Sequence, residues 1–187
     1  AIKVPVFSFS RLPNVDPILG VEMASTGEVA CFGYDVKETY LKALISSGLK
    51  VPRKNILVSI GNDTVKYDFI NSLVSLDKMG YVVHMTSGTY EFYRNIDSDM
   101  SSVIKTDIED VFDSIKGNKI ELLINIPQNI YSNNNNNSTN GFKMRRMCLD
   151  YNIPVITNIK CAKLFVSSLR EFKKNGLDYV SWNEYMI

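Results

Sequence analysis

Six residues with ligand-binding chemistry follow short apolar runs, at the points where strands are expected to end. Each of them carries a hydroxyl, amide or ammonium group, or, in the case of glycine, leaves the backbone accessible. The set consists of Lys66, Thr86, Gly88, Thr89, Lys105 and Asn125. Ligands of open α/β sheets bind beyond the carboxyl ends of the strands. We therefore expect these six residues to gather at one edge of a sheet and to form a ligand site.

The chemistry of the set suits a phosphate group. The threonine hydroxyls donate hydrogen bonds, and the lysine ammonium groups supply compact positive charge. Gly88 lies in the turn before an expected short helix, where unpaired N–H groups and the helix dipole favour an anion and glycine allows close approach. The amide of Asn125 can hydrogen-bond a second part of the ligand. The set therefore predicts an anion site.

Four residues of the set also have an ordinary structural interpretation. Thr89 can cap a helix, Lys66 and Lys105 can be solvated surface side chains, and Asn125 can be a turn residue. The convergence of all six at one sheet edge is what favours the ligand site.

The elements that must position this set alternate between strands and helices from about residue 52 onward. The strand candidates are residues 55–60, 81–85, 103–104, 120–126 and 155–157. Between them, apolar residues recur at the spacing of one helix face. This pattern is carried by Val65, Phe69, Leu73 and Leu76, then by Ile108, Val111, Phe112 and Ile115, by Met144, Met147, Cys148 and Tyr151, and by Cys161, Phe165, Leu169 and Phe172. The alternation predicts an α/β fold with a doubly wound, five-stranded parallel sheet.

Several residues predict where these helices begin and end. Asn62 or Asp63 can cap the first helix, and Gly80 in the left-handed C-terminal position ends it. Thr106 with Glu109 predicts a capping box at the start of a later helix. These signals place the helix boundaries close to the strand ends that carry the ligand set.

Two segments lie outside this alternation. Residues 1–50 are β-rich and then form a helix opened by Asp35, with Glu38 three places on. We expect them to be the tail of a preceding domain and a linker helix, with residues 51–187 forming the α/β domain. Asn133–Asn137 cannot bury enough apolar area to offset its ordering entropy, so we expect a mobile surface loop. The sequence does not begin with methionine, and we expect it to be a piece of a longer polypeptide.

Composition and charge exclude several classes of partner. The chain is 45% hydrophobic and 22% charged, as in globular domains, with a formal net charge of +1. This balance gives no broad attraction to nucleic acid or to an anionic membrane. No apolar run approaches the roughly 20 residues needed to span a bilayer. We therefore expect neither a nucleic-acid nor a membrane partner.

No motif predicts a catalytic centre, a metal site or a cofactor site. The glycine-rich dinucleotide and phosphate-loop motifs are absent from the sequence. His84 is the only histidine and lies inside an expected strand, which favours a packed side chain over a general base. The cysteines Cys31, Cys148 and Cys161 lie far apart, which favours reduced, buried thiols in a cytosolic protein.

Structural roles are predicted for three further residues. Arg145 and Arg146 are neighbours on an expected helix and point apart, which favours a solvated or inter-domain role over a ligand contact. Trp182 is expected to pack the carboxyl-terminal tail onto the rest of the chain.

Several stretches resemble the carbamoyl-phosphate synthases. The end of the second synthetase half in that family is similar to VFSFSRLP at residues 6–13 and DPILGVEMASTGEV at residues 16–29. The helix that joins this half to the allosteric domain resembles residues 40–48, which contain LKAL. The end of the allosteric domain in pyrimidine-pathway members resembles IKCAKLFV at residues 159–166.

The resemblance implies a regulatory domain with a methylglyoxal-synthase-like fold. In nucleotide-regulated members a lysine of the first helix, the threonines of a Thr-x-Gly-Thr turn, a later lysine and a strand-end asparagine hold the effector. The matching positions are Lys66, Thr86, Thr89, Lys105 and Asn125. The implied partners are a phosphorylated effector such as UTP, UMP or phosphoribosyl pyrophosphate and the remaining domains of the synthase.

The resemblance also implies where the chemistry lies. The whole enzyme makes carbamoyl phosphate from glutamine or ammonia, bicarbonate and ATP, and ATP and Mg²⁺ are expected in its synthetase halves. No catalytic centre and no cofactor are expected in this chain. The implied compartment is the cytoplasm.

Three alternatives remain open at this point, and one of them is an inter-domain structural piece with a vestigial pocket. The urea-cycle type of synthase binds N-acetylglutamate, is mitochondrial, and has tryptophan at the position of Lys105 and asparagines at Gln128 and Gly141. These departures favour a phosphorylated effector here. A methylglyoxal-synthase-like lyase is the third alternative, and the Gly-Asp-Gln-Gln stretch of that enzyme is missing from this sequence.

Overall fold

The computed structural model describes residues 1–96, 100–128 and 139–186. The strands are β1 (Ile2–Val6), β2 (Gly27–Cys31), β3 (Asn55–Ile60), β4 (Val82–Met85), β5 (Val103–Lys105), β6 (Leu122–Ile126) and β7 (Val155–Ile156). The α-helices are α1 (Val36–Ser46), α2 (Asp63–Lys78), α3 (Ser87–Arg94), α4 (Ile108–Lys116), α5 (Asn140–Asp150) and α6 (Ile159–Asn175). Short 3-10 helices occur at η1 (Phe9–Arg11) and η3 (Trp182–Met186). The Asn133–Asn137 run lies outside the described residues.

The predicted α/β fold with a five-stranded parallel sheet is confirmed. The strand order is β5-β4-β3-β6-β7, and each neighbouring pair is parallel. The chain begins this sheet at β3, adds β4 and β5 on one side, and then returns to add β6 and β7 on the other. The order therefore reverses between β3 and β6, which makes their carboxyl ends the topological switch point of the sheet.

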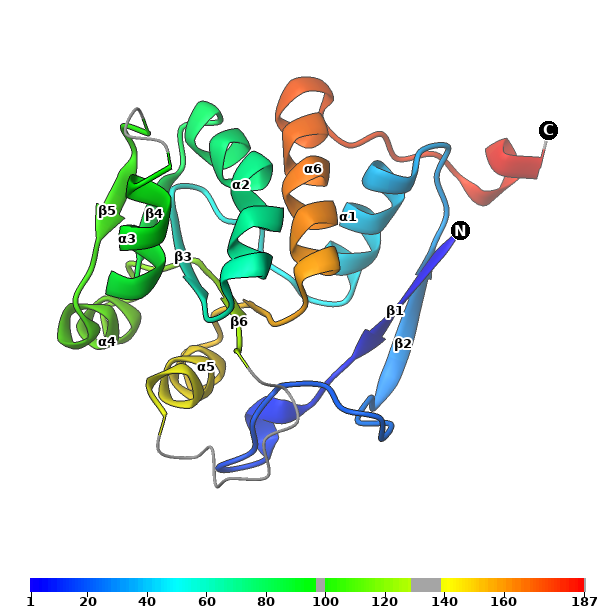
Figure 1. The fold of residues 1–187 in the computed structure, drawn as a ribbon. Helices are drawn as coiled ribbons and strands as arrows, with labels where there is room; N and C mark the ends of the chain where they lie inside the picture. The colour runs from blue at the N-terminus through cyan, green and yellow to red at the C-terminus, as the bar shows by residue number, and fades with distance from the viewer. Residues whose placement is uncertain (97–99, 129–138, 187) are drawn as a thin grey trace.

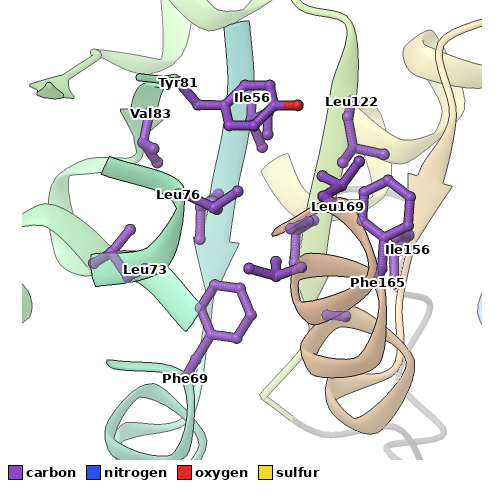
Figure 2. Close-up of a cluster of buried hydrophobic side chains, with 14 of the residues drawn as sticks. Ile56, Phe69, Leu73, Leu76, Tyr81, Val83, Leu122, Ile156, Phe165 and Leu169 are labelled. Carbon is purple, nitrogen blue, oxygen red and sulfur yellow. The ribbon is translucent and has the colours of Figure 1, made fainter. Parts of the chain in front are cut away.

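One face of the sheet is covered by α2, α3 and α6, and α1 packs on the outer side of α6. Figure 2 shows α2 and α6 lying over the strands, and Phe69 and Leu73 of α2 belong to the same apolar cluster as Phe165 and Leu169 of α6. These apolar side chains pack against alternate residues of β3 and β6, such as Ile56, Val58, Leu122 and Ile124. The helical stripes read from the sequence are therefore the stripes that bury the first face of the sheet.

The other face is covered by α4 and α5. The residues buried there include Leu57 of β3, Leu123 of β6, Val111 and Ile115 of α4, and Met144 and Cys148 of α5. Since strand residues alternate between faces, the polar residues Ser59 and Asn125 also belong to this second face. Their position at the carboxyl ends of β3 and β6 places them at the switch point.

The ends of the helices agree in part with the predicted signals. The Asn62 side chain accepts hydrogen bonds from the N–H groups of Thr64 and Val65, and Gly80 has a positive φ of 79°. The capping box predicted for Thr106 and Glu109 is wrong, because α4 is capped at Asp107 without a side-chain bond. The N–H of Thr106 instead donates to the carbonyl of Met85, so this residue continues the β5 pairing.

Residues 1–50 form a two-stranded antiparallel sheet, a connecting loop with η1, and α1. The sheet pairs β1 with β2, and α1 packs beside α6 while η1 approaches α5 (Figure 1). Three buried side chains of α1, Tyr40, Leu41 and Ala43, belong to the same apolar core as α2 and α6. The linker helix is therefore part of the packed body of the protein.

The carboxyl-terminal tail returns to this first segment. The ring of Trp182 packs edge-on against Phe32, with centroids 4.6 Å apart. The hydroxyls of Tyr34 and Tyr185 donate to the carbonyls of Glu184 and Phe32 at 3.3 and 3.1 Å. The predicted packing role of Trp182 is confirmed.

The prediction of buried thiols holds for one cysteine only. Cys148 is buried beneath the second face of the sheet, Cys31 is half-buried, and Cys161 is exposed on the first turn of α6. Burial raises the pKa of the Cys148 thiol to about 12.

Among the described helices, none is both long and apolar enough to cross a bilayer.

Candidate functional site

A pocket opens at the switch point, between the carboxyl ends of β3 and β6 and the start of α5. Its volume is about 310 Å³. The residues that line it are Ile18, Ser59, Gly61, Asn125, Ile126, Pro127, Gln128, Thr139, Gly141 and Arg145. Pockets that bind small ligands are commonly about 300 to 1,000 Å³. This pocket lies at the lower end of that range.

Two glycines that line the pocket lie so close to neighbouring atoms that a side chain would have little or no room. A Cβ atom at Gly61 would lie 2.7 Å from the backbone nitrogen of Gln128, so a side chain has no room there. A Cβ at Gly141 would lie 3.1 Å from Nη1 of Arg145 and 3.7 Å from Oδ1 of Asn125. The lack of a side chain at Gly141 therefore leaves the guanidinium of Arg145 facing the pocket.

The start of α3 lies beside this pocket and carries three of the predicted site residues. Thr86 is the N-cap of α3 and makes no side-chain cap bond. Within the described residues, the backbone N–H groups of Ser87 and Gly88 make no hydrogen bond. Gly88 is exposed, and a side chain there would meet no atom within 4 Å. This helix start therefore presents free N–H donors in an open space, where an anion is favoured.

Hydrogen bonds link the start of α3 to the switch point. The hydroxyl of Thr86 lies 3.2 Å from the hydroxyl of Ser59, to which it donates, and 3.2 Å from that of Thr89. The side-chain nitrogen of Asn125 donates to the carbonyl of Ser59 at 3.1 Å. Thr86, Ser59 and Asn125 thus form one continuous polar strip across three neighbouring strands.

Thr89 has a structural role that the sequence did not predict. Its hydroxyl accepts from the N–H of Ile60 at 3.0 Å and lies 3.4 Å from the carbonyl of the same residue. Thr89 is buried. It is not the N-cap of the helix, as the alternative interpretation had it, and it fastens the first turn of α3 to the end of β3.

Lys66 lies on the first turns of α2 and reaches the start of α3. Its ammonium group donates to the carbonyl of Gly88 at 3.2 Å and to the carboxylate of Asp63 at 2.9 Å. It also lies 5.1 Å from the centre of the Phe92 ring. The side chain of Lys66 is only 8% exposed, so the solvated-lysine interpretation is wrong. The Lys66 amine therefore contacts the turn that carries the hydroxyls of Thr86 and Thr89.

Lys105 is placed differently from the rest of the predicted set. Its backbone pairs with Met85, one residue before Thr86, so it does lie at the same edge of the sheet. Its ammonium group, however, bonds to the carboxylate of Glu91 at 3.1 Å and is partly exposed. The structure thus joins Lys66, Thr86, Gly88 and Thr89 directly and Asn125 through Ser59, while the Lys105 side chain turns toward α3.

Arg145 and Arg146 were expected to be solvated or to join two domains, and the solvated interpretation is wrong. Both are buried. Nη1 of Arg145 donates to Oδ1 of Asn125 at 2.5 Å, and Nε donates to the carboxylate of Asp16 at 2.7 Å. Arg146 donates to the carbonyls of Phe9 and Leu12. Both arginines therefore contact residues 1–50, and Arg145 also lines the pocket.

His84 lies within β4 as expected and is engaged on both ring nitrogens. Nδ1 lies 3.3 Å from the hydroxyl of Thr106, and Nε2 lies 3.3 Å from the side-chain oxygen of Asn55. Burial lowers the pKa of this imidazole. In the part of the chain that the structure describes, no group of three or more His, Cys, Asp or Glu side chains is arranged to hold a metal ion.

The comparison with protein families identifies the family of the domain that contains the sheet. The family model of the MGS-like domain matches residues 68–157, which run from α2 through β7 and include the start of α3 and the switch-point strand β6. Residues 68–157 belong to the MGS-like domain family. Within the MGS-like domain lie five of the six predicted site residues, and Lys66 lies two residues before it.

Curated relatives extend the similarity over nearly the whole chain. The chain is 46% identical to the multifunctional protein pyr1-3 of Dictyostelium discoideum over 188 aligned residues, covering 97% of this chain and 8% of that protein. It is 41% identical to the multifunctional protein CAD of Squalus acanthias, covering 90% of this chain and 8% of that protein. It is 33% identical to the mitochondrial ammonia-type carbamoyl-phosphate synthase of Homo sapiens, covering 93% of this chain and 12% of that protein.

These relatives confirm the resemblance to carbamoyl-phosphate synthases. The chain spans only about a tenth of the length of these curated relatives. The identity is higher to the multifunctional proteins than to the ammonia-type synthase. An MGS-like domain with its preceding segment is therefore what this chain shares with much longer proteins.

Sequence reasoning missed Ser59, Gly141 and Arg145 as parts of the pocket. Ser59 reads as one residue of a strand, and only the alternation of β3 places its side chain on the α5 face. Arg145 contacts Asp16 across 129 residues of sequence, and no local pattern predicts that pairing.

Proposed function

We propose that this chain is the regulatory end of a carbamoyl-phosphate synthase of the pyrimidine-pathway type. It binds a phosphorylated effector, such as UTP, UMP or phosphoribosyl pyrophosphate, at the carboxyl edge of the MGS-like sheet. Lys66, Thr86, Gly88, Thr89, Lys105 and Asn125 are the proposed effector-binding residues, joined by Arg145. The chain itself carries no step of carbamoyl phosphate synthesis in this proposal.

The observation that supports this proposal most is the joining of two anion-favouring features at one edge. The start of α3 offers the N–H groups of Ser87 and Gly88, which have no partner among the described residues, and the ammonium of Lys66 bonds to the carbonyl of Gly88 in the same turn. The switch-point pocket offers the amide of Asn125 and the guanidinium of Arg145. A phosphate on α3 and a second polar part of the effector in the pocket would use both features at once.

The charges of the site leave room for an anion. The carboxylate of Asp63, which pairs with Lys66, is 71% exposed and is free to turn into solvent. The carboxylate of Glu91 that pairs with Lys105 is exposed as well. An entering phosphate would replace these exposed carboxylates at the two ammonium groups. The pair of Lys105 with Glu91 is exposed on both sides, and such pairs contribute only about 0–1 kcal/mol.

The regulatory effect follows from linkage. An effector changes the activity of the parent enzyme only by binding one of its states more tightly, and such couplings are typically about 1–3 kcal/mol. The relatives are an order of magnitude longer than this chain, so the partners of the site are proposed to be the other domains of the same polypeptide. The ammonia-type synthase, with lower identity, is the less favoured template for the effector.

Titration calorimetry on the purified chain with UTP, UMP, phosphoribosyl pyrophosphate and N-acetylglutamate tests this function. We expect saturable binding of at least one phosphorylated compound and weaker or no binding of N-acetylglutamate. Tight binding of N-acetylglutamate alone would assign the chain to the urea-cycle type. Failure of all three phosphorylated compounds to bind would refute the proposed function.

A further inference from the structure

The segment before α1 is held on α5 by two buried arginines. Nη1 of Arg146 donates to the carbonyls of Phe9 and Leu12 at 3.1 and 2.8 Å. The same guanidinium bonds to the carboxylate of Asp150 one turn later. Arg146 is not among the residues that line the switch-point pocket. Its role is therefore to hold the segment 9–18 on the helix, and it does so through backbone carbonyls.

Arg145 connects this segment to the pocket. Its side chain is only 4% exposed, and it makes a two-bond contact with the carboxylate of Asp16 through Nε and Nη2. The remaining nitrogen, Nη1, donates to Oδ1 of Asn125 inside the pocket. The Nε–Nη2 edge of the guanidinium thus pairs with the carboxylate of Asp16, and Nη1 points toward the pocket.

The segment also supplies part of the pocket surface. Ile18 lines the pocket, and its N–H donates to the carboxylate of Asp16 at 3.2 Å. Asp16 therefore orders its own turn and orients Arg145 at the same time. If the segment left α5, the pocket would lose the Ile18 side, and the buried guanidinium would lose the carboxylate that fixes its direction.

We propose that residues 9–18 are an integral part of the effector site, and that their docking on α5 is a condition of tight effector binding. This inference rests on the proposed function. Asp16 acts as a positioning residue for Arg145, and Ile18 closes one side of the pocket. Occupancy of the site and docking of the segment are then linked, so the effector strengthens the contact between the MGS-like domain and the residues that precede it.

Hydrogen exchange on the wild-type chain tests the linkage directly. The reporters are the amides of Arg11, Leu12 and Ile18, which bond to Ser8, Phe9 and Asp16 within the docked segment. The control is the amide of Gly176, which bonds to Phe172 at the far end of α6. At a concentration of UTP or phosphoribosyl pyrophosphate about 100 times its Kd, exchange that requires undocking slows by up to about 100-fold. The exchange of Gly176 is expected to stay unchanged.

A matched pair of variants tests the same linkage from the other side. Arg146→Met removes the bonds to the segment without touching a pocket residue, and Arg170→Met removes an exposed arginine of α6. We expect Arg146→Met to weaken binding of the same compound roughly ten-fold, because only the docked fraction of the protein binds tightly. Arg170→Met is expected to bind like the wild type.

The outcomes separate this inference from the proposed function. Binding to the wild type with unchanged exchange of the reporter amides overturns the inference and leaves the proposed function standing. If the wild type binds none of UTP, UMP and phosphoribosyl pyrophosphate, the proposed function fails and the linkage fails with it. If Arg146→Met does not fold, the exchange measurement on the wild type still decides the question.

Discussion

Replacing Lys66 by methionine removes the ammonium group from the proposed phosphate site and keeps most of the side-chain volume. In the structure this ammonium is 3.2 Å from the Gly88 carbonyl, beside the free N–H groups at the start of α3. A hydrogen bond to a charged group is worth roughly 1.5–3 kcal/mol. Since every 1.4 kcal/mol is a tenfold change in affinity, we expect Lys66→Met to weaken effector binding by roughly 10- to 150-fold.

The same variant should keep its fold. The partner carboxylate of Lys66, on Asp63, is largely exposed, and Gly88 is exposed too, so the change leaves no buried charge without a partner. We expect the free energy of unfolding to fall by no more than the roughly 1.5–3 kcal/mol of one charged hydrogen bond. Titration calorimetry with UTP and phosphoribosyl pyrophosphate gives the affinity, and urea unfolding gives the stability.

The control for this experiment is Lys163→Met. Lys163 is a partly exposed lysine of α6 that pairs with Asp68 at 2.5 Å, away from the start of α3. The Lys163→Met variant should bind the effector like the wild type. If Lys66→Met also binds like the wild type while remaining folded, the ammonium does not contact the effector and the reasoning for the α3 site is refuted.

Three further predictions follow from single contacts. Gly88→Leu should keep or slightly raise stability, because leucine favours a helix over glycine by roughly 1 kcal/mol and meets open space, yet calorimetry should show weaker effector binding. Partial burial alone would raise the pKa of Glu121, but bonds from the N–H groups of residues 53–55 outweigh it and lower the pKa. Its stabilisation is thus present above the unfolded value of about 4.3 and lost as pH falls through the lower folded pKa. Glu121→Gln should lower the unfolding free energy at pH 7 by roughly 1–3 kcal/mol and weaken its dependence on acid pH in urea titrations. Tyr93→Phe removes a buried hydroxyl that donates to the Lys66 carbonyl at 2.9 Å, so urea unfolding should show a loss of about 1 kcal/mol; an unchanged midpoint in either stability variant would contradict the assignment of its contact.

The fold was predictable because its strands and helices carry strong local patterns. The run at 55–60 became β3, and the stripe of Phe69, Leu73 and Leu76 became the buried face of α2. The order of the strands was not predictable in detail, because it depends on the side of the sheet to which each crossover returns. The capping box failed at Thr106 because pairing of β5 with β4 takes its N–H, and a local signal cannot include that competition.

The site was predictable only as far as it lies on strand ends. Lys66, Thr86, Gly88 and Thr89 come together because β3 and β4 are adjacent and each leads directly into a helix. Lys105 reaches the same edge, but its side chain pairs with Glu91, and residue type alone does not give that direction. Arg145 could not be assigned, because its partner Asp16 belongs to a segment that folds back from the other end of the chain.

The position of Trp182 gives this protein an internal optical probe. It is the only tryptophan of the sequence, and it sits edge-on to Phe32 with just over half of its surface, 54%, open to water. Its emission therefore comes from one place, where the tail meets the stretch between β2 and α1. A spectral shift on adding a non-absorbing anion would report, without any label, that a change at the sheet edge has spread to the opposite end of the molecule.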